Sequence, residues 1–181
     1  RTIYFTWSKP GPGGTGTAAS RAILDEANPS RPRLREQQII FEMERKTNRG
    51  QHYGSRLSFL PDGTLLLSTG DRGEMNRAQD LLDAAGKTHR INTDGSIPGD
   101  NPFVTQTGKA LPSIYSYGHR NPQGLYVDAE GRIWLSEHGP QGGDELNLVE
   151  AGKNYGWPVI THGRQYGSGA RIGEGTHKAG M

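Results

Sequence analysis

Apolar and polar residues alternate over short segments of this chain, and two of these segments repeat each other. Residues 57–68 align with residues 125–136 at an offset of 68, so that the apolar positions, an acidic–glycine pair and the final serine coincide. Each copy predicts a short strand, a tight turn at Asp62-Gly63 or Glu130-Gly131, and a second strand with alternating faces. The pattern therefore predicts a protein built from repeated β-hairpins.

Further strands are expected to extend each copy, over residues 87–92 before the Asp94-Gly95 turn and over residues 145–149 before Ala151-Gly152. Four short strands in a repeating unit are typical of a β-propeller blade. The offset of 68 exceeds the roughly 40–50 residues of simple propeller repeats, which indicates insertions such as residues 99–112. The fold class is therefore all-β, and the chain is expected to form about two and a half to three blades of a propeller.

The first 50 residues contain a strand-like run at residues 2–7, followed by a glycine-rich loop. The loop, Gly11-Pro12-Gly13-Gly14-Thr15-Gly16, satisfies the G-x-G-x-x-G pattern that joins a strand to a helix in dinucleotide-binding folds. Here residues 8–10 separate it from the strand, and no alternation of strands and helices follows. We therefore expect a hairpin loop, with strands near residues 17–24 and 34–42.

Composition agrees with short strands joined by tight turns, because 27 of the 181 residues are glycine and 11 are proline. The formal net charge is +2, and no basic run carries interleaved aromatic residues, so nucleic acid is not an expected partner. No apolar segment approaches the roughly 20 residues of a membrane span. The absence of cysteine excludes disulfides, thiolate catalysis and cysteine-based metal sites.

We expect the sequence to be cut at both ends. Arg1 opens directly into the strand-like run, with neither an initiator methionine nor a signal peptide, and residues 163–181 are glycine-rich and polar. We therefore expect residues 1–181 to be a partial propeller domain that is truncated at both ends. Because an open propeller exposes apolar faces and unpaired strand edges, the isolated chain is expected to be weakly stable.

Three polar loops carry the residues that are suited to chemistry. His52 precedes the first strand of a repeat and could act as a general base, since neutral imidazole accepts protons near neutral pH. Residues 119–124 combine arginine, asparagine and glutamine, which suit an anionic, oxygen-rich ligand. Residues 137–147 offer backbone carbonyls and carboxylates, the hard oxygens that Ca²⁺ selects, although their spacing is not that of an EF-hand.

A purely structural role is the alternative for each of these loops. His52 could be a capping or surface histidine, and the polar side chains of the other two loops could cap neighbouring strands. His89, His162 and His177 show no metal-ligand spacing and are interpreted as structural or solvated.

Taken together and in order, the loops resemble the soluble PQQ-dependent aldose sugar dehydrogenases and glucose dehydrogenases. The resemblance covers nearly the whole chain. The matching segments are His52-Tyr53-Gly54-Ser55-Arg56-Leu57, Asp94-Gly95-Ser96-Ile97-Pro98 with Asp100-Asn101-Pro102, Tyr117-Gly118-His119-Arg120-Asn121-Pro122-Gln123-Gly124, Glu137-His138-Gly139-Pro140 with Asp144-Glu145-Leu146-Asn147, and Asn154-Tyr155-Gly156-Trp157-Pro158.

The resemblance implies a six-bladed propeller that oxidises aldose sugars at the anomeric carbon to lactones, with hydride transfer to pyrroloquinoline quinone (PQQ). His52 would be the catalytic base that takes the proton of the anomeric hydroxyl, and Arg120 would stabilise the reduced quinone. Contacts to PQQ would come from Gln51, Arg120, Asn121 and Gln123. Gln51 stands where the glucose-oxidising branch has an aspartate, which indicates the aldose sugar dehydrogenase branch.

The resemblance also implies two calcium ions. The backbone carbonyls of Gly139 and Pro140 would bind the Ca²⁺ that holds PQQ, and Glu145 and Tyr155 would bind a second, structural Ca²⁺. It further implies an aldose substrate, an external electron acceptor, a monomer or homodimer, and a periplasmic or secreted location. The family's upstream glutamine and its downstream lysine and arginine contacts to PQQ lie outside this sequence, so the chain alone is expected to be inactive.

Two other functions fit a propeller with these loops. One is a non-catalytic binding module of the hedgehog-interacting-protein type, and the retention of His52 and Arg120 favours the enzyme over it. The other is a Ca²⁺-dependent hydrolase of the lactonase-like propeller type, which should place more carboxylates at the channel mouth than this sequence provides.

Overall fold

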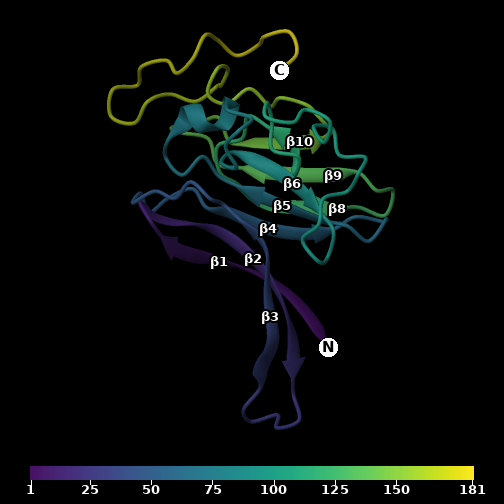
Figure 1. Ribbon diagram of the computed structural model, residues 1–181. Coiled ribbons are helices and arrows are strands. Elements are labelled where there is room, and N and C mark those ends of the chain that lie inside the picture. The colour runs from purple at the N-terminus through teal and green to yellow at the C-terminus, as the bar shows by residue number, and fades with distance from the viewer.

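The computed structural model describes residues 1–181 and consists almost entirely of strands in three antiparallel sheets. Figure 1 shows the sheets following one another along the chain, as successive blades of a propeller do. The first sheet contains β1 (Thr2–Gly11), β2 (Gly14–Asp25) and β3 (Arg33–Glu42); the second contains β4 (Gly54–Phe59), β5 (Leu65–Thr69), β6 (Lys87–Ile91) and β7 (Ile114–Tyr117); the third contains β8 (Pro122–Val127), β9 (Ile133–Glu137) and β10 (Glu145–Val149). One 3-10 helix, η1 (Met75–Gln79), is the only helical element. The all-β, partial-propeller prediction is confirmed.

The repeated segments form the hairpins β4–β5 and β8–β9, as the sequence predicts. Their turns have the same hydrogen bonds at the same offset: Gly63 N donates to Leu60 O at 2.9 Å, and Gly131 N donates to Asp128 O at 3.0 Å. Both turn glycines have positive φ, +83° at Gly63 and +80° at Gly131, a conformation that other residues adopt at a cost. The acidic–glycine pair of the sequence therefore marks one turn geometry used twice.

The remaining strands are close to expectation, with two differences. The strands expected over residues 87–92 and 145–149 are β6 and β10, and residues 99–112 form no strand. The glycine-rich loop forms the short turn between β1 and β2, both of which are longer than predicted, and no helix follows it. The sequence did not predict β7, a strand of four residues that completes the second sheet.

The core lies between the sheets, with β5 at its centre. Leu65 and Leu67 face the first sheet, where they pack with Ile40. Leu66 points the opposite way and packs with Leu135 of β9. Because successive residues of a strand face opposite sides, three consecutive leucines bury both faces of β5. This stacking of the sheets brings the hairpins β4–β5 and β8–β9 side by side.

The outer face of the third sheet exposes a row of apolar side chains. Tyr126 of β8 and Leu146 and Leu148 of β10 are 64%, 70% and 45% exposed. In a propeller the next blade covers such a face. The weak stability of the isolated chain stays a prediction, and this face is its physical basis.

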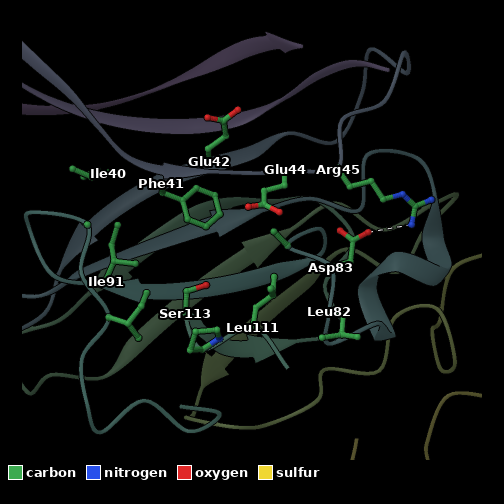
Figure 2. Close-up of a pocket in the computed structure, with 14 residues that line it drawn as sticks. Ile40, Phe41, Glu42, Glu44, Arg45, Leu82, Asp83, Ile91, Leu111 and Ser113 are labelled. Carbon is green, nitrogen blue, oxygen red and sulfur yellow. Dashed lines mark hydrogen bonds and ion pairs between the residues drawn. The ribbon is translucent and has the colours of Figure 1, made fainter. Parts of the chain in front are cut away.

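A groove of about 340 Å³ separates β3 from the second sheet (Figure 2). Ile40, Ile91 and Leu111 line its apolar part. At one end Arg45 and Asp83 form an ion pair, with 3.2 Å between Nη1 and Oδ2. None of its lining residues belongs to the three polar loops, so the groove is part of the wall between two blades.

Two ionisable side chains of β6 are fully buried. Lys87 Nζ donates to the carbonyl oxygens of Arg77, Ala78 and Ala85 at 2.9, 3.1 and 2.6 Å, which ties η1 to the start of β6. Burial lowers the pKa of Lys87 to about 7 and that of His89 to about 3. The structural interpretation of His89 is confirmed, and His162 and His177 are exposed as expected.

The buried ammonium of Lys87 predicts a pH-dependent contribution to stability. Its pKa is lower in the folded state than in the unfolded state, so between these values the unfolded state binds more protons and the free energy of unfolding rises with pH. We expect the difference in unfolding free energy between wild type and Lys87→Met, measured by urea denaturation, to increase from pH 7 to pH 9.5. The exposed Lys109→Met variant should show no such trend, and a flat difference for Lys87→Met would contradict this account.

Candidate functional site

The first polar loop places His52 against Asp71, a residue that the sequence did not single out. His52 Nδ1 lies 2.7 Å from Asp71 Oδ1. The Asp71 carboxylate is 1% exposed and also accepts hydrogen bonds from Gly73 N at 2.7 Å and from Trp157 Nε1 at 2.8 Å. An ionised carboxylate can only accept, so the proton of the neutral imidazole belongs on Nδ1 and Nε2 keeps its lone pair. The pair has the arrangement of a general base that is oriented by a carboxylate.

Antiparallel pairing explains why these two residues meet. His52 precedes β4 and Asp71 follows β5, and Gly54 at the start of β4 pairs with Thr69 at the end of β5. The residues just outside a hairpin's open end therefore lie at the same edge of the sheet. An acidic residue directly after a buried strand, at the same edge as the candidate base, is the signal that could have identified Asp71.

Gly70 allows the first two polar loops to approach each other. A methyl group at this position would overlap the carbonyl group of His52 and would lie 3.1 Å from Arg120 O. The adjacent Asp71 N donates to Arg120 O at 2.8 Å, and Gly54 N donates to Asn121 Oδ1 at 3.3 Å. The end of β5 is thus the crossing point at which the loop of His52 contacts the loop of Arg120.

A buried histidine–carboxylate pair holds the second loop. His119 Nδ1 lies 2.8 Å from Glu137 Oε1, and its Nε2 lies 2.8 Å from Ser116 Oγ. Glu137 Oε2 accepts a 2.6 Å hydrogen bond from Arg120 N. The His119 ring also stacks on Tyr155, with 4.9 Å between ring centroids. These contacts fix the backbone from which Arg120 and Asn121 project.

The Arg120 side chain connects the second loop to the third. Its Nη1 donates to His138 O at 2.9 Å and to Gly139 O at 2.6 Å. Gly139 N in turn donates to Asp144 Oδ1 at 2.8 Å. The guanidinium remains at the border of an open cavity, where it can offer its other N–H groups to a ligand.

This cavity, of about 690 Å³, brings most of the predicted site residues together. Gln51, His52, Arg120, Asn121, Gly139 and Pro140 line it, together with His138, Gln141, Gly142, Asp144 and Tyr166. Its volume is in the range of sites that bind small molecules and cofactors. Gln123, Glu145 and Tyr155 do not border it. The Gln123 side chain instead lies 3.2 Å from His138 Nε2.

Gly139, Pro140 and Asp144 border the same cavity. Their carbonyl and carboxylate oxygens are of the kind that Ca²⁺ prefers. Arg120 Nη1 donates to the Gly139 carbonyl here, so a calcium ion bound to this oxygen would compete with the guanidinium for it. No group of three or more histidine, cysteine or acidic side chains is arranged to hold a metal.

The carboxyl group of Glu145 lies near that of Glu137, outside the cavity. Burial, and then the charge of Glu137, raise the pKa of its carboxyl group. Asn147 Nδ2 donates to both carboxylates, at 3.1 Å each. The Tyr155 hydroxyl donates to Leu148 O at 2.7 Å and accepts from Glu150 N at 2.8 Å, so the backbone carbonyl of Tyr155 is the oxygen that is better placed to bind a metal.

Comparison with known proteins gives a consistent result. The whole chain, residues 1–181, matches the family Glucose / Sorbosone dehydrogenase. The aldose sugar dehydrogenase YliI of Escherichia coli is 40% identical over 176 residues, which are 96% of this chain and 46% of that protein. The chain therefore spans about half the length of the curated relatives that it matches.

Solved structures extend this similarity to three dimensions. The apo-form of the soluble aldose sugar dehydrogenase of E. coli matches with a TM-score of 0.93 and 38% identity, over all of this chain and 52% of that one. The PQQ-bound form of an aldose sugar dehydrogenase from Streptomyces coelicolor matches with a TM-score of 0.75 and 34% identity, over 94% of this chain and 47% of that one. Among the elements of the present structure, no helix has the length and apolar character needed to cross a membrane.

The close approach at Gly70 predicts that Gly70→Ala will destabilise the protein. The added methyl group must displace the His52 carbonyl, and overpacking of this kind costs about 1–3 kcal/mol. The matched control is Gly99→Ala, where nothing lies within 4 Å of the added carbon. Urea denaturation should show the loss for Gly70→Ala, while Gly99→Ala should stay within about 0.5 kcal/mol of wild type. Equal stabilities of the two variants would refute the crossing of the loops at this glycine.

Proposed function

Because the chain belongs to the Glucose / Sorbosone dehydrogenase family, we propose that the complete protein oxidises aldose sugars at the anomeric carbon to lactones, with PQQ as the hydride acceptor. The single observation that carries this proposal is that His52, which is hydrogen-bonded to Asp71, borders the same cavity as Arg120. A base and a cation beside one cavity are the groups that the oxidation of a hydroxyl group to a carbonyl requires.

His52 is the proposed catalytic base. Its Nε2 would accept the proton of the anomeric hydroxyl while the hydrogen on the anomeric carbon leaves as hydride, and the C–O bond becomes the carbonyl of the lactone. Asp71, which is hydrogen-bonded to Nδ1, would stabilise the imidazolium that forms and would keep Nε2 directed at the substrate. The proton would thus go to His52, and the electron pair would leave as hydride for PQQ.

The polar side chains around the cavity fit an anionic, oxygen-rich cofactor such as PQQ, which supplies the electron-accepting quinone when it is bound. Arg120 would hold it by charge-assisted hydrogen bonds, and the same positive charge would stabilise negative charge that develops on it. Gln51 and Asn121, which line the same cavity, would add neutral donors. Gln123 would join them only by giving up its contact with His138.

We propose Ca²⁺ as the second cofactor. The carbonyls of Gly139 and Pro140 would bind the ion beside PQQ, and Arg120 would exchange its contact with Gly139 O for contacts with the cofactor. Glu145 and the backbone of Tyr155 would bind a structural ion, and the mutual repulsion of Glu145 and Glu137 supports a cation there.

The remaining partners are proposed from the same chemistry. Each sugar oxidised leaves two electrons, so an external electron acceptor must regenerate the cofactor. The complete protein is proposed to act as a monomer or homodimer in the periplasm or outside the cell. The presence of a base with its orienting carboxylate favours this enzyme over a non-catalytic propeller module.

The test is reconstitution of the complete protein with PQQ and Ca²⁺, followed by measurement of aldose-dependent dye reduction. We expect turnover by wild type and a loss of roughly 10²–10⁴-fold in kcat for His52→Ala, because that is the usual contribution of a general base. The control is His162→Ala, since His162 is exposed and outside the cavity. If PQQ does not bind, the dehydrogenase assignment is wrong. If His52→Ala turns over like His162→Ala, the base is another residue.

A further inference from the structure

We propose that Arg72 is a positioning residue that holds the loop of His52 in register with Asp71. The proposal rests on the proposed function insofar as it takes His52 to be the catalytic base. Arg72 does not line the cavity. It immediately follows Asp71 in the chain, and its side chain is completely buried.

The partners of the Arg72 guanidinium lie on both sides of His52. Nη1 donates to Gln51 O, and Nη2 donates to Arg49 O at 2.7 Å. Nη2 also makes longer hydrogen bonds to Thr15 O and Thr15 Oγ1, at 3.5 and 3.4 Å. The guanidinium carbon lies 3.4 Å from the centroid of the Tyr53 ring, so the planar group stacks on this ring. One side chain therefore holds the residue before His52 through its carbonyl and the residue after it through its ring.

Burying the positive charge of Arg72 in this way costs folding free energy. The guanidinium makes no ion pair with a carboxylate, and its Nε is buried without a hydrogen-bond partner. Burial lowers the pKa of Arg72, which reflects the cost of keeping the charge away from water. An apolar side chain could fill the same space at less cost, but it could not donate to two carbonyl groups at once.

The backbone shows why these segments need to be held. His52 has φ of +54° and Arg72 has φ of +58°, both in the left-handed region that residues with a β-carbon occupy at a cost. Such conformations persist where surrounding contacts determine them. The contacts of Arg72 with Gln51, Arg49 and Tyr53 are contacts of this kind for the turn at His52.

The consequence concerns the geometry between the imidazole and the carboxylate. Asp71 and Arg72 are adjacent, so the backbone that carries the carboxylate also carries the clamp on the turn at His52. The clamp thereby fixes the 2.7 Å separation of His52 Nδ1 and Asp71 Oδ1 and the tautomer that this contact selects. Without it the turn can rotate, and Nε2 no longer faces the substrate with its lone pair.

Two variants separate positioning from simple electrostatics. Arg72→Lys keeps the positive charge but loses the planar stack and the fork that reaches two carbonyls, whereas Arg72→Gln loses the charge as well. The matched control is Arg77→Lys, because Arg77 is also buried but is bonded to Asp83, by Nε at 2.8 Å and Nη2 at 2.9 Å.

The first readout is the ¹⁵N NMR spectrum of the histidine side chains in the complete protein, with the His52 signals assigned from a His52→Gln sample. Wild type and Arg77→Lys should show His52 as the single Nδ1–H tautomer. Both Arg72 variants should show a mixture with the Nε2–H tautomer. The second readout is steady-state kinetics with PQQ and Ca²⁺, in which kcat of both Arg72 variants should fall roughly 100-fold while KM stays within about twofold.

Each other outcome decides against the proposal. If Arg72→Lys keeps the wild-type tautomer and kcat while Arg72→Gln does not, charge rather than positioning is the role of Arg72. If both variants keep the wild-type tautomer, Arg72 does not position His52. If they do not fold, Tyr53→Leu, which removes the ring beneath the guanidinium, must give the tautomer mixture or the proposal fails. The NMR result does not require turnover, so it stands even if the protein proves not to oxidise sugars.

Discussion

The hydrogen bond between His52 and Asp71 is the contact on which the rest of the site depends. Asp71 is almost fully buried and accepts from three donors, one of which, Trp157, lies 86 residues further along the chain. A buried carboxylate is stable only where its acceptor positions are filled by good donors. To fill these positions, the loop before β4 contributes His52 and the segment after β10 contributes Trp157, and both therefore pack against the end of β5. What satisfies the carboxylate also orients the imidazole.

The sheets supply the frame that makes this convergence possible. Leu65, Leu66 and Leu67 bury both faces of β5 between the neighbouring sheets, so apolar packing holds the end of β5 in place independently of the polar contacts. The inner hairpins β4–β5 and β8–β9 present their open ends at one edge, where all three polar loops lie. The buried pair of His119 and Glu137 then locks the second loop as Asp71 locks the first.

The strands were largely predictable from the sequence because their signals are local: a 68-residue repeat, alternating apolar positions, and turn glycines such as Gly63. β7 was missed because four residues, Ile114–Tyr117, are too short to show a period. Six residues that the family resemblance singles out border one cavity, and their roles there stay predictions: Gln51, His52, Arg120, Asn121, Gly139 and Pro140. Asp71 and Arg72 were missed because an acidic and a basic residue side by side in a loop look solvated. The pairing of β4 with β5 places both at the same edge of the sheet as His52, and the structure shows that both are buried.

The proposed role of Asp71 is to prepare His52 as the base by accepting a hydrogen bond from its Nδ1–H. Its most direct test is the rate at which an aldose reduces the complete, PQQ- and Ca²⁺-loaded protein in a single turnover, compared between wild type and Asp71→Asn. With this role for Asp71, the Asp71→Asn variant should bind PQQ as tightly as wild type but be reduced roughly 10²–10⁴-fold more slowly, because an asparagine can donate to Nδ1 and favour the wrong tautomer. Reduction of Asp71→Asn at the wild-type rate would contradict it.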